Sequence, residues 1–299
     1  MSLFGSIRLA SNALRADQIA LQVVGQNIAN ANTPGYIREE VVLSPAATQT
    51  IGTLSLGLGV QVDSIVQKLD KYLEGRLQGA ISDRASTAAQ EDTYLQLEQI
   101  VGETTDTDIS TAMTDLFNSI SDILNQPEDV SVRNLAVLNA KTLTERINWV
   151  ADSVNQLRSD INDRVVSIAD EINTLVEKIR SLNVKIAEIE GGTASKSVAV
   201  GLRDQRVSAL EELAGLVDIR VAEQDSGSVT VYVGGEFLVA DGMSRSVEAV
   251  LSGDRGMEVA SVRLRDSNYP LSVTSGELYG QLVSRDEVLG GFLDVEQAI

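Results

Sequence analysis

The chain contains no cysteine and no histidine among its 299 residues. These absences exclude disulfide bonds, thiol and imidazole nucleophiles, and nearly all zinc and haem sites. No stretch approaches the ~20 continuous apolar residues of a transmembrane helix. The first residues also lack the basic region, apolar core and cleavage site of a secretory signal peptide. From these absences we predict no membrane span, no metal, no cofactor and no enzymatic activity.

Aromatic residues are scarce as well, at 4% of the chain, and Trp149 is the only tryptophan. Hydrophobic residues as a whole are ordinary, at 43%. A chain that is poor in aromatics but rich in alanine, leucine, isoleucine and valine is typical of long helices packed side by side. Its length is enough for two domains or more.

Positive charge is also in short supply, since the net charge is −19 and the sequence pI about 4.4. Nucleic-acid binding usually needs a basic face, so we expect no nucleic-acid partner. The acidity is uneven: residues 1–36 hold two arginines and one aspartate, which gives that segment a net charge of +1. Repulsion is therefore low in the segment for which we predict tight packing.

The N-terminal segment carries an apolar row with helical spacing. The row recurs every seven residues, with companions that fill the same stripe: Ile7, Leu14, Leu21 and Ile28, then Leu3, Ala10 and Val24. This spacing predicts a helix that lies against other helices. Gly5 and Gly25 weaken such a helix by roughly 1 kcal/mol each relative to alanine. We therefore predict that the segment is largely disordered in an isolated molecule and becomes helical when partner subunits cover the row.

A cluster of asparagines and a Pro-Gly turn follow this row. Asn27, Asn30 and Asn32 crowd the helix end, and the run Thr33-Pro34-Gly35 then stops it. Pro34 disfavours a helical conformation at Thr33, and Gly35 can supply the positive φ of a type II turn. Two interpretations stay open. The amides either form only a helix end with turn chemistry, or they also bond across subunits.

The rest of the chain alternates helical and extended patterns. Residues 39–43 and 47–62 indicate extended or loop structure. We expect one helix from Asp63, capped by Asp63 or Ser64, to Gly102, and a second from Asp106 or Thr107 to Pro127. The period-two and turn patterns predict a short helix at 202–213, then strands near 217–221, 229–233, 236–240, 247–251 and 258–265, and a helix from Ser275.

The region from about 130 to 190 predicts a single long helix. Its main apolar row keeps an unbroken spacing of seven: Ile147, Val154, Ile161, Ile168, Leu175, Leu182 and Ile189. Neither proline nor glycine interrupts residues 147–190, so a continuous helix there exceeds roughly 60 Å. The row favours a rigid rod in an elongated domain and a coiled coil of any other purpose equally.

Three patterns that suggest a ligand or catalytic site fail on closer comparison. Asp106-x-Asp108 begins like a calcium loop but lacks the glycine and glutamate at positions six and twelve. The run 191–197 has Ser195 where a phosphate loop has glycine, and a helix leads into it. Paired carboxylates, which a glycosidase uses, are plentiful but are typical of solvated helix faces.

The N-terminal residues carry a resemblance to a known family. Leu14, Leu21, Val24, the run Asn27-Ile28-Ala29-Asn30, the run Asn32-Thr33-Pro34-Gly35-Tyr36 and Arg38 resemble the signature of bacterial flagellar rod, hook and hook-associated proteins. Later segments, among them LRDQR at 202–206 and SGELYGQLVSRD at 275–286, resemble the hook-associated branch that joins hook to filament. The likeness covers essentially the whole chain.

The resemblance implies a structural component of the flagellum, at the junction between hook and filament. The partners it implies are the flagellar hook protein, a second hook–filament junction protein, further copies of the chain in an axial oligomer, and an export chaperone for the C-terminal end. It implies an extracellular location after type III export without a cleaved signal peptide. The implied subunit-assembly residues are Ile7, Leu14, Leu21, Val24, Asn27, Ile28, Asn30, Asn32, Thr33, Pro34, Gly35 and Tyr36.

Two other functions stay open. An intracellular coiled-coil scaffold or adaptor explains the heptads of residues 147–189 equally well, but it does not explain the asparagine and Pro-Gly turn. Another flagellar rod or hook axial protein shares the N-terminal signature. In the hook-associated family a second apolar helix, at the C-terminus, pairs with the N-terminal one. Because this chain stops at Ile299, we expect either a fragment or a chain without that pairing partner.

Taken together, these patterns predict a mainly α protein with a small antiparallel β unit, built as an elongated bundle of long helices plus a β subdomain. We expect an axial assembly segment at 1–62, a long-helix bundle at 63–215, a β subdomain at 216–273 and the start of a further helical region, truncated, at 274–299.

Overall fold

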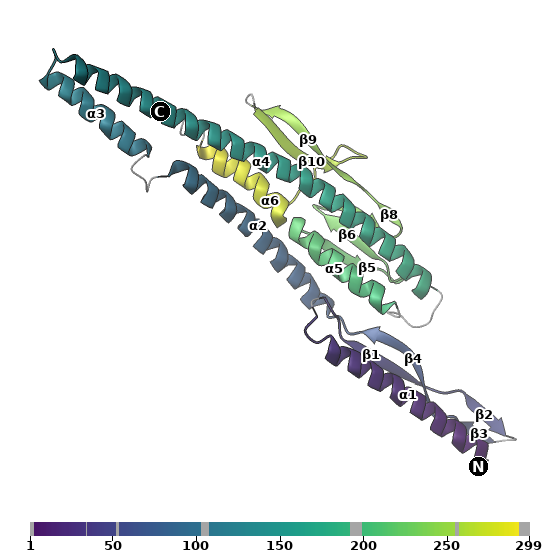
Figure 1. Ribbon diagram of the computed structural model, residues 1–299. Coiled ribbons are helices and arrows are strands. Elements are labelled where there is room, and N and C mark those ends of the chain that lie inside the picture. Colours follow the sequence, from purple (N-terminus) through teal and green to yellow (C-terminus); the bar gives the residue numbers. More distant parts are fainter. Residues whose placement is uncertain are drawn as a thin grey trace. The chain divides into compact units, whose positions relative to one another are not determined.

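The computed structural model describes residues 3–33, 35–51, 54–102, 108–191, 199–254 and 257–292. Figure 1 shows a mainly helical chain with small antiparallel sheets, which confirms the predicted fold class. The helices are α1 (Leu3–Ala29), α2 (Lys71–Val101), α3 (Ile109–Asn125), α4 (Val130–Glu190), α5 (Val200–Leu216), α6 (Gly276–Val283) and the π-helical turn η1 (Ser284–Leu289). Across the described ranges, none of them is apolar enough over a sufficient length to cross a membrane.

The strands form four small sheets. They are β1 (Glu39–Pro45), β2 (Thr48–Ile51), β3 (Leu54–Gly57), β4 (Val60–Gln67), β5 (Arg220–Glu223), β6 (Val229–Val233), β7 (Glu236–Ala240), β8 (Met243–Ser244), β9 (Val247–Asp254) and β10 (Met257–Leu264). β1 pairs with β4, β2 with β3, and β9 with β10, while β5 to β8 form one sheet in chain order. The strands near 229–233, 236–240, 247–251 and 258–265 lie where the sequence predicts them.

The contacts divide the chain into two compact units. One consists of Met1–Ser82, Glu171–Val247 and Leu264–Thr274, and its core lies where α5 and the sheet β5–β8 meet the last third of α4. The other consists of Asp83–Asp170, Glu248–Arg263 and Ser275–Ile299, and its core gathers apolar residues of α4, β10 and α6. The strands between residues 216 and 273 are therefore divided between the units.

The long helix predicted at about 130–190 is confirmed as α4. The apolar row of α4 repeats every seven residues, and its middle is buried. Val154, Ile161 and Ile168 are each at most 4% exposed. The two ends of the row, Ile147 and Ile189, are 40% and 45% exposed. The row therefore faces a core through most of its length and emerges from it at both ends.

One predicted helix start is wrong. The helix predicted from Asp63 begins at Lys71, because Val60–Gln67 pairs with β1 and so continues as a strand. The side chain of Asp70 accepts hydrogen bonds from the amides of Tyr72 and Leu73, which makes it the cap that was assigned to Asp63 or Ser64.

The next helix, predicted from Asp106 or Thr107, begins at Ile109 with Asp108 as its N-cap. The Asp108 side chain accepts from the Thr111 amide at 2.6 Å, which satisfies one free donor of the first turn. Asp106 and Thr107 themselves lie outside the described residues. The predicted end of α2 at Gly102 is confirmed, and Gly102 adopts a φ of 57°.

Candidate assembly surface

The apolar row of α1 lies on the surface of the molecule. Five of the residues predicted to take part in assembly are between 51% and 72% exposed: Ile7, Leu14, Leu21, Val24 and Ile28. Exposed large apolar groups are common one at a time, but a row along one helix marks a surface that another chain covers. The predicted row is thus present and lacks a cover within the part of this chain that the structure describes.

The opposite side of α1 packs on the hairpin of β1 and β4. Ala16 and Val23 are 3% and 4% exposed there, and the Asn12 side chain donates through Nδ2 to the carbonyl of Leu58 at 3.1 Å. The segment is therefore helical in a single chain, whereas the sequence predicted disorder until partner subunits cover it. The helix has a partner within its own chain, the pair of strands β1 and β4, and no pattern in the sequence links that pair to the helix.

Asn27 joins the end of α1 to the start of β1. Its Nδ2 donates to the carbonyl of Glu39 at 2.9 Å, and its Oδ1 accepts from the Glu39 amide at 2.9 Å. The Tyr36 hydroxyl donates to the same Oδ1 at 2.9 Å. Burial, with a contribution from the charge of Glu39, raises the pKa of Tyr36, so this hydroxyl stays a donor at neutral pH.

The turn after α1 is built from local hydrogen bonds. Asn30 donates through Nδ2 to the carbonyl of Gln26 and accepts through Oδ1 from the Thr33 hydroxyl at 3.2 Å. The Tyr36 amide donates to the carbonyl of Thr33, and Gly35 has the expected positive φ, 75°. Pro34 lies outside the described residues. Asn27 and Asn30 thus serve the turn of their own chain, while Asn32 is exposed.

A second group of polar residues fixes this hairpin to α5. The Gln67 side chain donates to Asp204 Oδ1 at 2.5 Å and to the carbonyl of Val200 at 3.2 Å, and the Ile37 amide also donates to Asp204. Burial raises the pKa of Asp204 in spite of these hydrogen bonds. Burial, together with the charge of Asp204, raises the pKa of Glu39 as well.

The same LRDQR run supplies the centre of a buried ion-pair network. Arg203 pairs with Glu190 at 2.6 Å and with Glu223 at 2.7 Å, and Lys71 completes the network by pairing with Glu223. Burial would raise the pKa of Glu223, but the hydrogen bonds from Lys71 and Arg203 outweigh it and hold that pKa below its ordinary value. The sequence indicated this run only as a family match, because its partners lie far away in the chain.

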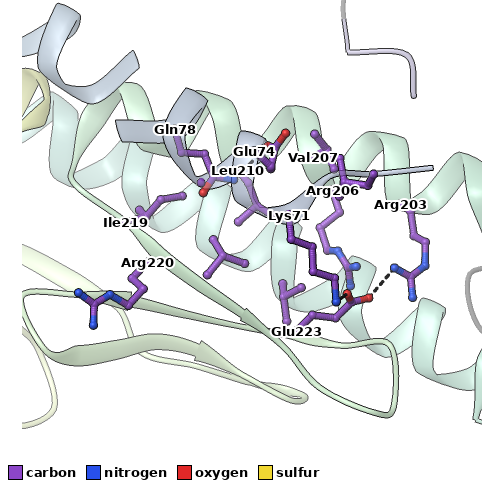
Figure 2. A pocket seen from close by; sticks show the side chains of 14 residues that line it. Lys71, Glu74, Gln78, Arg203, Arg206, Val207, Leu210, Ile219, Arg220 and Glu223 are labelled. Atoms are coloured by element: carbon purple, nitrogen blue, oxygen red, sulfur yellow. Dashed lines mark hydrogen bonds and ion pairs between the residues drawn. The ribbon is translucent and has the colours of Figure 1, made fainter. Parts of the chain in front are cut away.

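A cavity of about 310 Å³ lies beside this network. Figure 2 shows Lys71, Glu223, Arg203 and Arg206 gathered at one end of it, with Leu210 and Ile219 among the apolar side chains of its wall. Arg206 donates to Asn183 at 3.1 Å and to the carbonyl of Gly227 at 2.7 Å. Burial, reinforced by the charge of Arg203, lowers the pKa of Arg206 to about 10.

The charged groups beside the cavity form a structural ion-pair and hydrogen-bond network, which we call the brace. Lys71, Arg203 and Glu223 are occupied by one another, and Arg206 binds main-chain and amide oxygens. Within the described ranges, no three histidine, cysteine, aspartate or glutamate side chains come together as metal ligands do. Asp106 and residues 192–198, which belong to the rejected calcium and phosphate patterns, lie outside those ranges.

Long helices, small antiparallel sheets and an exposed apolar row on the first helix are typical of a helical protein that assembles with other chains. Comparison with known proteins identifies the family. A family model described as the flagellar hook-associated protein FlgK helical domain matches residues 94–294, and one described as flagella basal body rod protein matches residues 7–36. The chain therefore belongs to the FlgK family of flagellar hook-associated proteins.

Individual relatives agree with this assignment. Flagellar hook-associated protein 1 of Bacillus subtilis is 28% identical over 237 residues, which are 76% of this chain and 45% of that protein. The protein of the same name in Salmonella typhimurium is 26% identical over 248 residues, 82% of this chain and 44% of that protein. The structure of the flagellar hook junction protein FlgK from Burkholderia pseudomallei aligns at 25% identity with a TM-score of 0.60, over 72% of this chain and 39% of that one. The chain thus spans less than half the length of these relatives.

Proposed function

We propose that this chain is a structural subunit of the bacterial flagellum, located at the junction between hook and filament. The observation that carries the proposal is the exposed row of α1 in a chain of the FlgK family. A helix that packs on its own hairpin through one face and leaves an apolar row on the other has one face for folding and one for assembly. Leu14 and Leu21, at 63% and 72% exposure, lie in the middle of that row.

The partners follow from this location. We propose that the row contacts further copies of the chain in an axial oligomer, with the flagellar hook protein on one side and a second junction protein on the other. An export chaperone would hold the C-terminal end of the longer protein before export. The chain would reach the cell exterior through the flagellar export channel without losing a signal peptide.

The role we propose is mechanical and involves no catalysis. The charged groups beside the cavity of about 310 Å³ serve one another, and the family is one of structural flagellar proteins. The intracellular scaffold is disfavoured by the family assignment. A different rod or hook protein is disfavoured because the FlgK helical-domain model, and not only the shared N-terminal signature, matches the chain.

Charge placed on the row tests the proposal. The double substitution Leu14→Glu and Leu21→Glu, made in the full-length native protein, is expected to leave export intact but to remove the protein from isolated flagella. Gln22→Glu adds the same kind of charge at an exposed position of the same helix and is the matched control. Immunoblots of purified flagella and of culture medium measure both outcomes. Normal incorporation of the double variant, with normal swimming, would refute the proposed role of α1.

A further inference from the structure

The brace contains one buried donor that it does not use. Both hydrogen bonds of the Arg206 guanidinium leave from Nη1, one to Asn183 Oδ1 and one to the carbonyl of Gly227. Its Nε is buried and has no hydrogen-bond partner among the residues that the structure describes. The side chain as a whole is only 4% exposed. Buried polar groups nearly always have a partner, so an unused donor of this kind points to a ligand.

Arg206 lies at one end of the cavity of about 310 Å³, beside Lys71, Arg203 and Glu223 (Figure 2). The walls come from the start of α2, from α5 and from β5 and β6, all in one compact unit. Six of the lining residues are at most 7% exposed: Gln78, Arg203, Arg206, Val207, Leu210 and Val229. The space is therefore an internal cavity, which admits only an occupant that fits it, and differs from an outer apolar face that any neighbouring segment can cover.

The charge of the lining favours an anion. Four cations and two anions line the cavity: Lys71, Arg203, Arg206 and Arg220, then Glu74 and Glu223. Even when Glu190 is included, which pairs with Arg203, the cations exceed the anions by one. This surplus stands out in a chain whose net charge is −19. Burial lowers the pKa of Arg206 to about 10, and an anion in contact with the guanidinium would favour its charged form.

The free edge of Arg206 suits a carboxylate. Because Nη1 is occupied, the donors that remain are those of Nε and Nη2, which form the planar fork that binds the two oxygens of a carboxylate. The rest of the wall is largely apolar: Leu69, Val207, Leu210, Ile219, Val221 and Val229. A small inorganic anion would leave this wall without contacts, and a neutral apolar molecule would leave Nε without an acceptor.

We propose that this cavity binds a small amphipathic carboxylate, whose charged end accepts hydrogen bonds from Arg206 and whose apolar body lies against Leu210 and Ile219. The volume of about 310 Å³ lies at the lower end of the range of small-molecule sites, ~300–1,000 Å³. Such a ligand would bind the folded chain where α2, α5 and β5 meet, and would therefore stabilise that junction. The inference goes beyond the proposed function and does not depend on it.

Calorimetric titration of the full-length native protein, as secreted monomer, with octanoate tests the inference. We expect saturable binding of one octanoate per chain. 1-Octanol keeps the apolar body without the charge, and inorganic phosphate keeps a charge without the apolar body. Each should bind about tenfold more weakly than octanoate, or worse, because each lacks one of the two kinds of contact.

Two glycines of α2 provide a matched pair of variants. Gly75 lines the cavity, and a Cβ built on it meets no atom within 4 Å, so Gly75→Leu places a side chain at the cavity without a clash. Gly79, one turn later, has the same free space but is not among the lining residues. Gly75→Leu should weaken octanoate binding about tenfold or more, and Gly79→Leu should leave it unchanged.

Arg206→Lys tests the charged end, because lysine keeps the positive charge but lacks the planar fork, and it should also weaken octanoate binding. Circular dichroism checks its fold, and Gly75→Leu keeps the test decisive if Arg206→Lys does not fold. Equal octanoate affinity in Gly75→Leu and in the unaltered protein would overturn the inference. So would the lack of saturable binding to the full-length protein. Binding to residues 1–299 but not to the full-length protein would show that another part of that protein fills the cavity, and would overturn it as well.

Discussion

Asn183 binds both main-chain polar groups of Val229. Its Nδ2 donates to the Val229 carbonyl at 2.7 Å, and its Oδ1 accepts from the Val229 amide at 3.0 Å. An amide side chain presents the same donor and acceptor as a peptide group, so Asn183 replaces a neighbouring strand residue. Asn173 holds Val247 in the same way, at 2.9 and 2.8 Å. Asn162 binds the Glu258 carbonyl and the Ala260 amide.

Replacing Asn183 by leucine is expected to destabilise the fold strongly. The side chain is fully buried, and its Oδ1 also accepts from Arg206 at 3.1 Å. Leucine would leave the Val229 amide and carbonyl without this partner, each at a cost of ~1–3 kcal/mol, and would remove one of the two acceptors of Arg206, so we expect a loss of about 2 kcal/mol or more. Urea unfolding at neutral pH measures it. Asn155→Leu, at an exposed position of the same helix, should change stability little, and a similarly small change for Asn183→Leu would contradict the interpretation.

Gly234 and Gly235 form the two-residue turn between β6 and β7, and they should differ in their tolerance of alanine. Both have positive φ, 56° and 89°, as a type I′ turn requires. A Cβ on Gly234 would overlap the carbonyl oxygen of Ser272, whereas a Cβ on Gly235 meets open space. Gly235→Ala should cost about 1 kcal/mol, from the left-handed conformation alone.

Gly234→Ala should cost about 1–3 kcal/mol beyond that, because backbone atoms must move to admit the methyl group. Thermal unfolding of the two variants side by side measures the difference. Equal midpoints would mean that the approach of Ser272 is not a constraint on this turn.

The substitutions Asn27→Ala and Asn32→Ala are expected to have different effects. Asn27→Ala removes three hydrogen bonds that join α1, Tyr36 and Glu39, so it should lower hydrogen-exchange protection in α1 and the hairpin. Asn32 is exposed, so Asn32→Ala should leave that protection unchanged. If the asparagines also bond across subunits, Asn32→Ala should still reduce incorporation into flagella. Normal incorporation of the Asn32→Ala variant would favour the interpretation in which the asparagines only form the turn and do not bond across subunits.

Asp204 should give the attachment of the hairpin a distinctive pH dependence. Its pKa is raised in the fold, mainly by burial, so the folded state favours the protonated carboxyl. The stability it contributes is complete below the unfolded pKa, near ~3.9, and is lost as pH rises through the folded pKa. The side-chain amide introduced by Asp204→Asn does not titrate, so that variant stays neutral at this position throughout the window.

The free energy of unfolding of Asp204→Asn, minus that of the wild type, should therefore rise as pH increases through the window and then level off. Denaturant titrations across the acid range measure it, and taking the difference cancels the contributions of carboxylates such as Glu223. A difference that falls with pH would show that the hydrogen bonds from Gln67 and Ile37 outweigh burial.

The sequence predicted most of the helices because their apolar rows are long and regular. The apolar row from Ile147 to Ile189 repeats regularly, and Gly102 directly follows the end of α2. Both features could therefore be predicted from local sequence alone. The start of α2 was misplaced because Asp63 is a plausible cap by local criteria. Only pairing between β4 and a strand about twenty residues earlier keeps Val60–Gln67 extended.

The residues proposed for assembly were predicted from their type and spacing, but the different contacts of the individual asparagines were not. Nothing local indicates that Asn27 binds the backbone of Glu39 while Asn32 is left exposed. The brace around Arg203 is a similar case, because Glu190 and Glu223 come from different elements and meet only when α5 packs. Periodic features can be read along the chain, whereas specific polar partnerships depend on tertiary contacts.

Asn173 and Asn183 of α4 bind only the main-chain groups of Val247 and Val229 in these contacts. The outward-facing side chains of the strands are not involved. Tyr232 and Leu251, for example, are exposed and take no part in these bonds. Substitutions at such exposed positions are therefore expected to leave the attachment of these strands to α4 intact.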